Sequence, residues 1–161
     1  MMPLKQGAKW TYQYRAGLVS KVDEIAVVSV TETPLGRGWK LDGPGGSSKL
    51  VWSQGKLYAA QLAGTTYLPP LPIYAETESK WTGEVVSGHR VFDGTATVMS
   101  EDTKIRVGTK SEKAKLATIQ VNFGTQNFEV FLWFVRGIGI VRLEERSKGQ
   151  LNSSLDYLKG P

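Results

Sequence analysis

Residues 117–135 read Ala-Thr-Ile-Gln-Val-Asn-Phe-Gly-Thr-Gln-Asn-Phe-Glu-Val-Phe-Leu-Trp-Phe-Val. In the first part, apolar residues from Ala117 to Phe123 alternate with Thr, Gln and Asn. This period of two is typical of a β-strand with one buried face. Gly124-Thr125-Gln126-Asn127 then provides a turn, because glycine adopts the positive φ that hairpin turns need. The stretch therefore predicts an antiparallel hairpin.

The second strand of this hairpin is apolar on both faces. Phe128 and Phe134 belong to one face, and Phe131 and Trp133 belong to the other. An antiparallel strand of this kind needs cover on both sides, or an aromatic face that meets a ligand.

The same pattern of short strands and glycine turns continues along the chain. Asp23–Thr31 is rich in β-branched residues, and Ser53-Gln54-Gly55 separates two further short strands. We find no amphipathic helix of ten or more residues. The sequence predicts an all-β, antiparallel domain of roughly ten to twelve strands, arranged as a curved sheet or an open barrel.

Two short signals recur and indicate two pseudo-repeated β-meanders within a single domain, residues 1–161. Lys9-Trp10-Thr11 recurs as Lys80-Trp81-Thr82, and Leu50-Val51-Trp52 recurs as Phe131-Leu132-Trp133. Self-similarity of this kind suggests a duplicated unit. We place the repeats at about 3–66 and 73–158, joined by a proline-rich crossover at 67–72. Prolines lack the ladder donor, so we interpret 67–72 as a stiff crossover packed on the core, with a polyproline II ligand as the alternative.

The order of these signals also resembles a protein family. The pattern comprises Pro3, Leu4, Gly7, Trp10 and Tyr12, then a tryptophan strand with a glycine hairpin, Leu-Pro, a second Lys-Trp-Thr, and finally Leu132, Trp133, Gly137, Gly139 and Val141. It resembles a broad group of uncharacterised bacterial all-β proteins, many of them exported or lipid-anchored. The resemblance implies an all-β fold and an extracytoplasmic location, and it implies no activity.

Composition excludes several kinds of chemistry. The 161 residues contain no cysteine and one histidine, with a net charge of +5. Thiolate catalysis, disulfides and cysteine metal sites are therefore excluded. A zinc site built mostly of carboxylates would be rare. The sequence predicts no metal site and no cofactor.

The remaining candidates for catalysis are weak. His89 lies in a Ser-Gly-His-Arg turn with no nucleophile motif beside it, which favours a solvated histidine. Glu76 with Glu78, or Glu144 with Glu145, could form a carboxylate pair for hydrolysis. For Glu76 and Glu78, solvent-facing charges are the simpler interpretation. We therefore expect that the protein is not an enzyme, and keep a carboxylate-dependent hydrolase as the last alternative.

Binding is the leading hypothesis. We expect an envelope-associated module that holds an apolar ligand or a protein partner. Its candidate binding residues are the aromatics Trp52, Trp81, Phe131 and Trp133. The first alternative is a β-barrel that binds single-stranded nucleic acid through Lys104, Arg106 and Lys110. Nucleic acid is the less favoured partner, because acidic residues dilute these cations and aromatics are not interleaved with them.

The N-terminus begins Met1-Met2-Pro3-Leu4-Lys5 and shows no apolar signal-peptide core. We hypothesise that a native export signal precedes this sequence in the full-length gene. The protein would then be periplasmic, secreted or lipid-anchored, and otherwise cytoplasmic.

Overall fold

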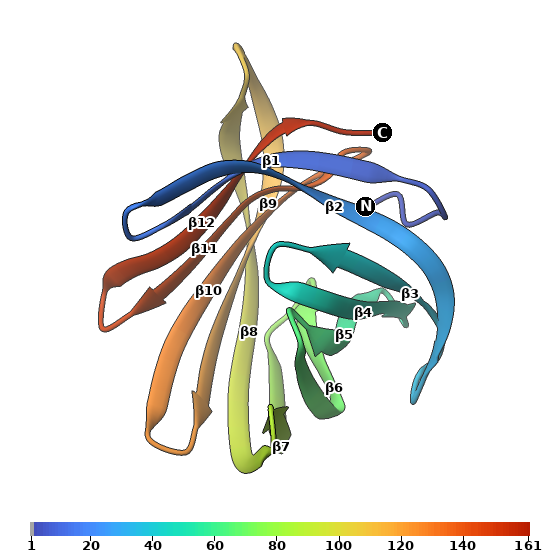
Figure 1. Cartoon of the computed structure of the whole chain (residues 1–161), viewed down its shortest axis with the longest axis vertical. Helices are drawn as coiled ribbons and strands as arrows, with labels where there is room; N and C mark the ends of the chain where they lie inside the picture. Colours follow the sequence, from blue (N-terminus) through green and yellow to red (C-terminus); the bar gives the residue numbers. More distant parts are fainter. Residues whose placement is uncertain (1) are drawn as a thin grey trace.

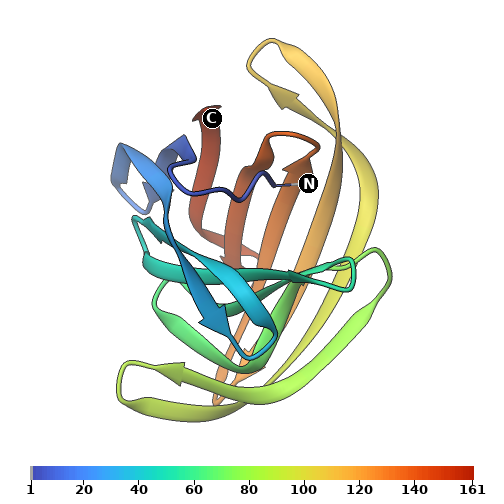
Figure 2. The ribbon, with the colours of Figure 1, turned by 90° about the vertical axis from the view of Figure 1, so that its right-hand side faces the viewer.

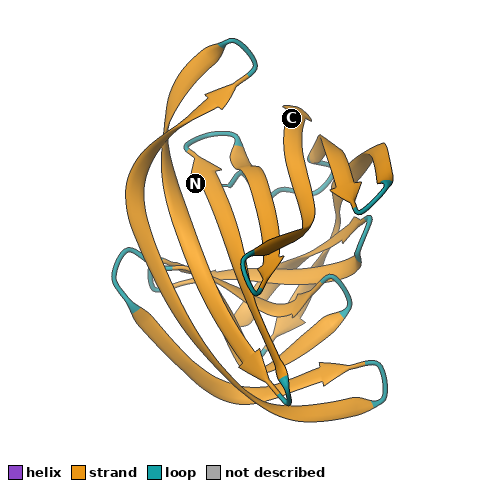
Figure 3. Cartoon of the chain, turned by 90° about the vertical axis from the view of Figure 1, so that its left-hand side faces the viewer, coloured by secondary structure: helices purple, strands orange, loops and turns teal. Residues whose placement is uncertain are grey.

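The computed structural model describes residues 2–161, and this part of the chain contains strands and turns but no helix (Figure 3). The twelve strands are β1 (Lys9–Ala16), β2 (Val19–Thr33), β3 (Gly36–Gly43), β4 (Gly46–Ser53), β5 (Lys56–Leu62), β6 (Thr65–Tyr74), β7 (Ser79–Ser87), β8 (Arg90–Val107), β9 (Lys110–Phe123), β10 (Gln126–Val135), β11 (Gly139–Ser147) and β12 (Gln150–Lys159). The predicted all-β antiparallel class is confirmed.

The strands form a closed barrel in which each strand pairs with its neighbours in sequence (Figure 1). β1 completes the ring by pairing with β12 from Thr11 and Lys159 to Ala16 and Ser153. Closure is the detail that the sequence did not predict. It removes both free edges, whose unpaired backbone groups would otherwise be open to pairing with other chains.

The proline-rich segment 67–72, expected as a crossover, lies within strand β6. On one side, β6 pairs with β5 as far as Leu57 and Tyr74. On the other side, its pairing with β7 covers only Thr66 to Leu68. The ladder to β7 ends where the prolines begin, as expected from residues that lack a backbone donor. The segment is therefore a strand of the barrel wall. Its short pairing with β7 is a weak joint between two neighbouring strands.

The recurring tryptophan signals occupy corresponding strands. Lys9-Trp10-Thr11 lies in β1 and Lys80-Trp81-Thr82 lies in β7, six strands further on. The second pair of signals falls in β4 and in β10, again six strands apart. Each half of the barrel thus carries its signals on its first and fourth strands.

The main core fills part of the barrel interior and includes Trp10, Leu57, Ile73 and Ile119, all at most 1% exposed. The N-terminal segment before β1 runs across one end of the barrel (Figure 2). Its Met2 is buried and belongs to the core cluster. At this end the Trp10 indole N–H donates to the Ile138 carbonyl at 2.7 Å, which ties β1 to the turn after β10. The N-terminal segment therefore closes this end.

A second, smaller cluster contains Ala114, Val135 and Val141, with Ile105 and Val107 packed against it. Ile105 and Val107 come from β8, one of the two long strands that project beyond their neighbours as a hairpin (Figure 2). The hairpin therefore covers apolar side chains at the end of β10 and the start of β11.

Candidate functional site

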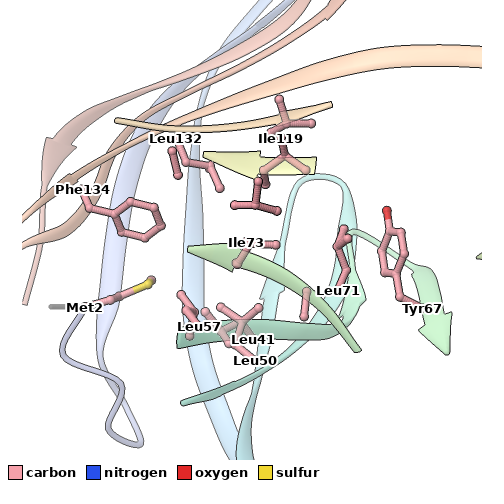
Figure 4. Packing of buried hydrophobic residues seen from close by; sticks show 14 of the residues in the cluster. Met2, Leu41, Leu50, Leu57, Tyr67, Leu71, Ile73, Ile119, Leu132 and Phe134 are labelled. Carbon is pink, nitrogen blue, oxygen red and sulfur yellow. The ribbon is translucent and has the colours of Figure 1, made fainter. Parts of the chain in front are cut away.

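The barrel encloses a cavity of about 380 Å³. Most of its lining is aliphatic or aromatic and comes from strands all around the ring. The principal apolar lining residues are Met2, Ile25, Leu41, Leu50, Leu62, Leu71, Ile73, Ile119, Val121, Phe128, Val130, Leu132, Ile140, Leu143 and Leu155. Several of them are seen from close by in Figure 4. A cavity of this size and lining is typical of small-molecule sites.

The cavity is closed at the end where Met2 lies and reaches solvent at the opposite end. Its lining there includes the β3–β4 turn, with Gly45 and Gly46, and Ala63 of the β5–β6 turn, all of which are exposed. Figure 4 shows Met2 at one side of the apolar cluster and Tyr67 at the other. The site is thus a one-ended apolar pocket.

The two turns at the mouth are held together by hydrogen bonds. The Gly64 amide donates to the Ser47 carbonyl at 2.8 Å, and the Ala63 amide donates to the Ser48 hydroxyl at 3.0 Å. Gly45 makes the approach possible, because a Cβ there would lie 2.9 Å from the Cβ of Ala63. The glycine-rich stretch 43–46 therefore shapes the rim of the cavity.

Polar side chains are concentrated near the mouth. Tyr67 of β6 and Glu145 of β11 both line the cavity, as do Ser48, Thr65 and Ser153. β6 and β11 lie on opposite sides of the ring. Burial, followed by the charge of Glu145, raises the pKa of the Tyr67 hydroxyl to about 12. Tyr67 is thus an uncharged hydroxyl at neutral pH, facing a carboxylate across the lumen.

A second tyrosine lies deeper in the barrel. The Tyr12 hydroxyl donates to the Ile140 carbonyl at 2.7 Å, so its hydrogen-bonding role is structural. Burial, and to a smaller degree Tyr157, raises the pKa of Tyr12 above its usual range. Tyr67 differs, because its hydroxyl has no hydrogen-bond partner within residues 2–161.

The predicted aromatic residues lie beside the cavity or outside it. Trp52 is half-buried in the core against Tyr74. Trp81 is buried, donates to the Pro69 carbonyl at 2.8 Å, and packs edge-on against Tyr67 at 5.9 Å between ring centroids. Neither residue lines the cavity, and Trp81 reaches the site only through Tyr67.

Phe131 and Trp133 lie on the outer face of β10. Arg146 lies over the ring of Phe131 at 5.4 Å, and Arg142 lies over the ring of Trp133 at 5.8 Å. These guanidinium groups provide the outer cover that a strand apolar on both faces needs. A binding role for Phe131 and Trp133 stays a prediction about the outer surface.

The predicted cations Lys104, Arg106 and Lys110 are exposed on the β8–β9 hairpin, away from the cavity lining. The hairpin residues 100–115 contain no aromatic side chain on which a base could stack. Glu76 and Glu78 are exposed in the β6–β7 turn, and His89 is exposed in the β7–β8 turn. None of these three residues lines the cavity.

Sequence reasoning did not identify Tyr67, and it considered Glu145 only as a possible hydrolytic partner of Glu144, not as a residue of a binding cavity. Tyr67 precedes the Leu-Pro-Pro segment, and Glu145 is the second of two adjacent glutamates. Neither position carries a motif. The available signal was weak: Glu145 lies two residues after Leu143, on a strand whose other inward side chains are apolar.

Residues 2–161 hold no cluster of three or more potential metal ligands. Within the same part of the chain, no helix has the length and hydropathy needed to cross a bilayer.

Comparison with known proteins identifies the fold. The chain matches no protein-family model, and it matches no curated protein significantly. It is similar in structure to a candidate lipoprotein from Parabacteroides distasonis, with a TM-score of 0.63, 12% identity, and coverage of 99% of this chain and 97% of that one.

Two further solved structures are similar. One is a candidate exported protein with a YmcC-like fold from Bacteroides fragilis, with a TM-score of 0.59, 12% identity and coverage of 99% and 98% of the two chains. The other is the hypothetical lipoprotein YmcC from Escherichia coli, with a TM-score of 0.51, 10% identity and coverage of 95% and 84%. At these identities the likeness shows a shared fold over nearly the whole chain.

Proposed function

We propose that this protein is a non-catalytic, extracytoplasmic binding module that holds an apolar small molecule inside its barrel. The observation that carries the proposal is the one-ended apolar cavity of about 380 Å³. A barrel built only for rigidity would gain stability by filling this space, because residual cavity volume is costly. The extracytoplasmic location is supported by the three similar structures, which belong to candidate lipoproteins and a candidate exported protein.

The cavity volume sets the size of the ligand. At about 30 Å³ for each water-sized group, 380 Å³ has room for roughly a dozen methylene groups. Burial of a methylene contributes about 0.8 kcal/mol, and association costs at least about 4 kcal/mol. A single chain of this length would therefore gain at most about 5.6 kcal/mol, which corresponds to a dissociation constant of about 80 μM or weaker. Two acyl chains of that length would not fit.

The test uses a neutral fluorescent probe, N-phenyl-1-naphthylamine, together with native mass spectrometry of protein purified without detergent. We expect the probe to become fluorescent on binding. We also expect the purified protein to carry a small apolar molecule that organic extraction removes. Absence of both signals would contradict the proposal.

Variants locate the binding. Ile119 of β9 lines the cavity, and Ile119→Trp should abolish probe binding by occupying the space. The control is Gln120→Trp, on the exposed outer face of the same strand, which should leave binding unchanged. Val130→Phe provides a smaller blockage should Ile119→Trp fail to fold by circular dichroism. Equal binding by a folded blocking variant and the control would place the probe outside the lumen.

A further inference from the structure

We infer that the cavity selects a single-chain amphiphile with an uncharged, hydroxyl-bearing head group and discriminates against fatty-acid anions. This inference rests on the proposed function and specifies its ligand. The overall charge of +5 would suggest a preference for anions. The residues that line the cavity indicate a preference against anions instead.

The first observation is the charge of the lining. Among the described residues, those that line the cavity include two carboxylates, Asp42 and Glu145, and no Lys, Arg or His. Asp42 is exposed and already engaged, since it accepts a hydrogen bond from the Ser47 hydroxyl at 2.6 Å and lies 3.9 Å from the Lys40 ammonium. Glu145 is therefore the carboxylate that a ligand would meet.

The second observation is the free hydrogen-bonding capacity at the mouth. The Tyr67 side chain is only 4% exposed, lines the cavity, and has no hydrogen-bond partner within residues 2–161. Its burial and the Glu145 charge keep it protonated, so it remains a donor. Glu145 receives one long contact, 3.5 Å from the Asn152 amide nitrogen, and it can accept further bonds. A donor and an acceptor with capacity for further hydrogen bonds thus face the same lumen.

A hydroxyl head group matches this pair, because a hydroxyl accepts from Tyr67 and donates to Glu145. A carboxylate can only accept, and at the mouth it would face the charge of Glu145 with no cation among the lining residues. Like charges at a partly desolvated contact are strongly unfavourable.

Besides Lys40, which is paired with Asp42, a second cation lies beside a lining residue: the Lys21 ammonium is over the ring of Tyr14 at 5.7 Å. Tyr14 lines the cavity, so Lys21 could in principle attract an anion to the mouth. However, its ammonium is 2.7 Å from the Asp23 carboxylate, and the pair is largely neutralised. The Lys21 side chain is also half-exposed, where salt screens its charge further.

The experiment compares two ligands with the same twelve-carbon chain, monododecanoylglycerol and dodecanoate, by displacement of N-phenyl-1-naphthylamine at pH 8. We expect monododecanoylglycerol to bind at least about tenfold more tightly. Glu145→Gln should strengthen dodecanoate binding about tenfold while changing monododecanoylglycerol binding by no more than a few-fold. Tyr67→Phe should weaken monododecanoylglycerol several-fold and leave the probe itself unaffected.

Glu144→Gln is the matched control. Glu144 is the adjacent carboxylate and lies on the outer face, where it accepts from Arg146 at 2.6 Å. The Glu144→Gln variant should leave the ratio of the affinities for monododecanoylglycerol and dodecanoate unchanged. The inference is overturned if dodecanoate binds as tightly as monododecanoylglycerol, or if Glu144→Gln shifts the ratio as much as Glu145→Gln does. Failure of the proposed function looks different, because then neither ligand nor probe binds.

Discussion

Replacement of Trp81 by phenylalanine should weaken the joint between β6 and β7 more than the loss of ring area alone explains. This joint has a short ladder, since β6 pairs with β7 only from Thr66 to Leu68. Beyond that point the Trp81 indole N–H donates to the Pro69 carbonyl at 2.8 Å. The ring also lies against Gly83, where a Cβ would approach it to 2.7 Å. Trp81 therefore replaces part of a missing backbone ladder.

The expected loss has two components. Removal of the hydrogen bond costs about 1 kcal/mol, and more if the carbonyl is left dry. The smaller ring leaves a void in a site that is only 6% exposed, which adds about another 1–2 kcal/mol. The free energy of unfolding should thus fall by about 2–3 kcal/mol. With a urea m-value of about 2 kcal/mol/M, the unfolding midpoint should fall by about 1 M or slightly more.

Urea unfolding followed by far-ultraviolet circular dichroism measures this shift, with Trp52→Phe as the control. Trp52 is half-buried, and its indole N–H has no hydrogen-bond partner within residues 2–161. Its replacement should cost about 1 kcal/mol or less. Equal losses for the two variants would refute the idea that the Trp81 hydrogen bond supports the joint.

Two further predictions concern stability. Gly83→Ala should cost about 1–3 kcal/mol by overpacking, because its Cβ would collide with the Leu68 carbonyl oxygen and the Trp81 ring; thermal unfolding would measure it, and an unchanged midpoint would contradict the packing described. Burial, with the Glu145 charge, raises the pKa of Tyr67 from about 10 in the unfolded chain to about 12. Between pH 10 and 12 the unfolded chain therefore releases a proton that the folded protein keeps, and stability falls by about 2–3 kcal/mol as pH rises through this window. Tyr67→Phe should remove that part of the alkaline loss in urea titrations, and identical pH profiles would show that Tyr67 is not shifted.

Local patterns in the sequence were sufficient to predict many of the strands, but not β6, whose prolines indicated a crossover. The alternation from Ala117 to Phe123 marks β9, and the turn after it connects β9 to β10. Closure of the barrel was not predictable from such patterns, because β1 and β12 lie at opposite ends of the sequence. Their pairing is decided by the accumulated twist and tilt of all twelve strands.

The cavity-lining residues of β11 could not be predicted from the sequence for a different reason. Strict alternation along β11 would place Val141, Leu143 and Glu145 on one face. In the structure, Val141 packs against Val135 and the β8–β9 hairpin, whereas Leu143 and Glu145 line the cavity. The register shifts between Trp133 and Phe134 of β10, opposite Arg142 and Ile140, and this bulge reverses the faces. A bulge depends on both paired strands, so the sequence of β11 alone does not reveal it.

The size of the barrel makes the cavity more than an accident of packing. A barrel of about eight strands is just filled by its own side chains, and a wider one retains space. This barrel has twelve strands and uses Met2, from outside the sheet, to fill one end. The remaining 380 Å³ is mostly apolar space that the side chains of the barrel do not fill. A ligand that fills the lumen would bind only the folded barrel and would therefore stabilise the fold as well as occupy the site. Ligand binding and folding stability are thus expected to rise together.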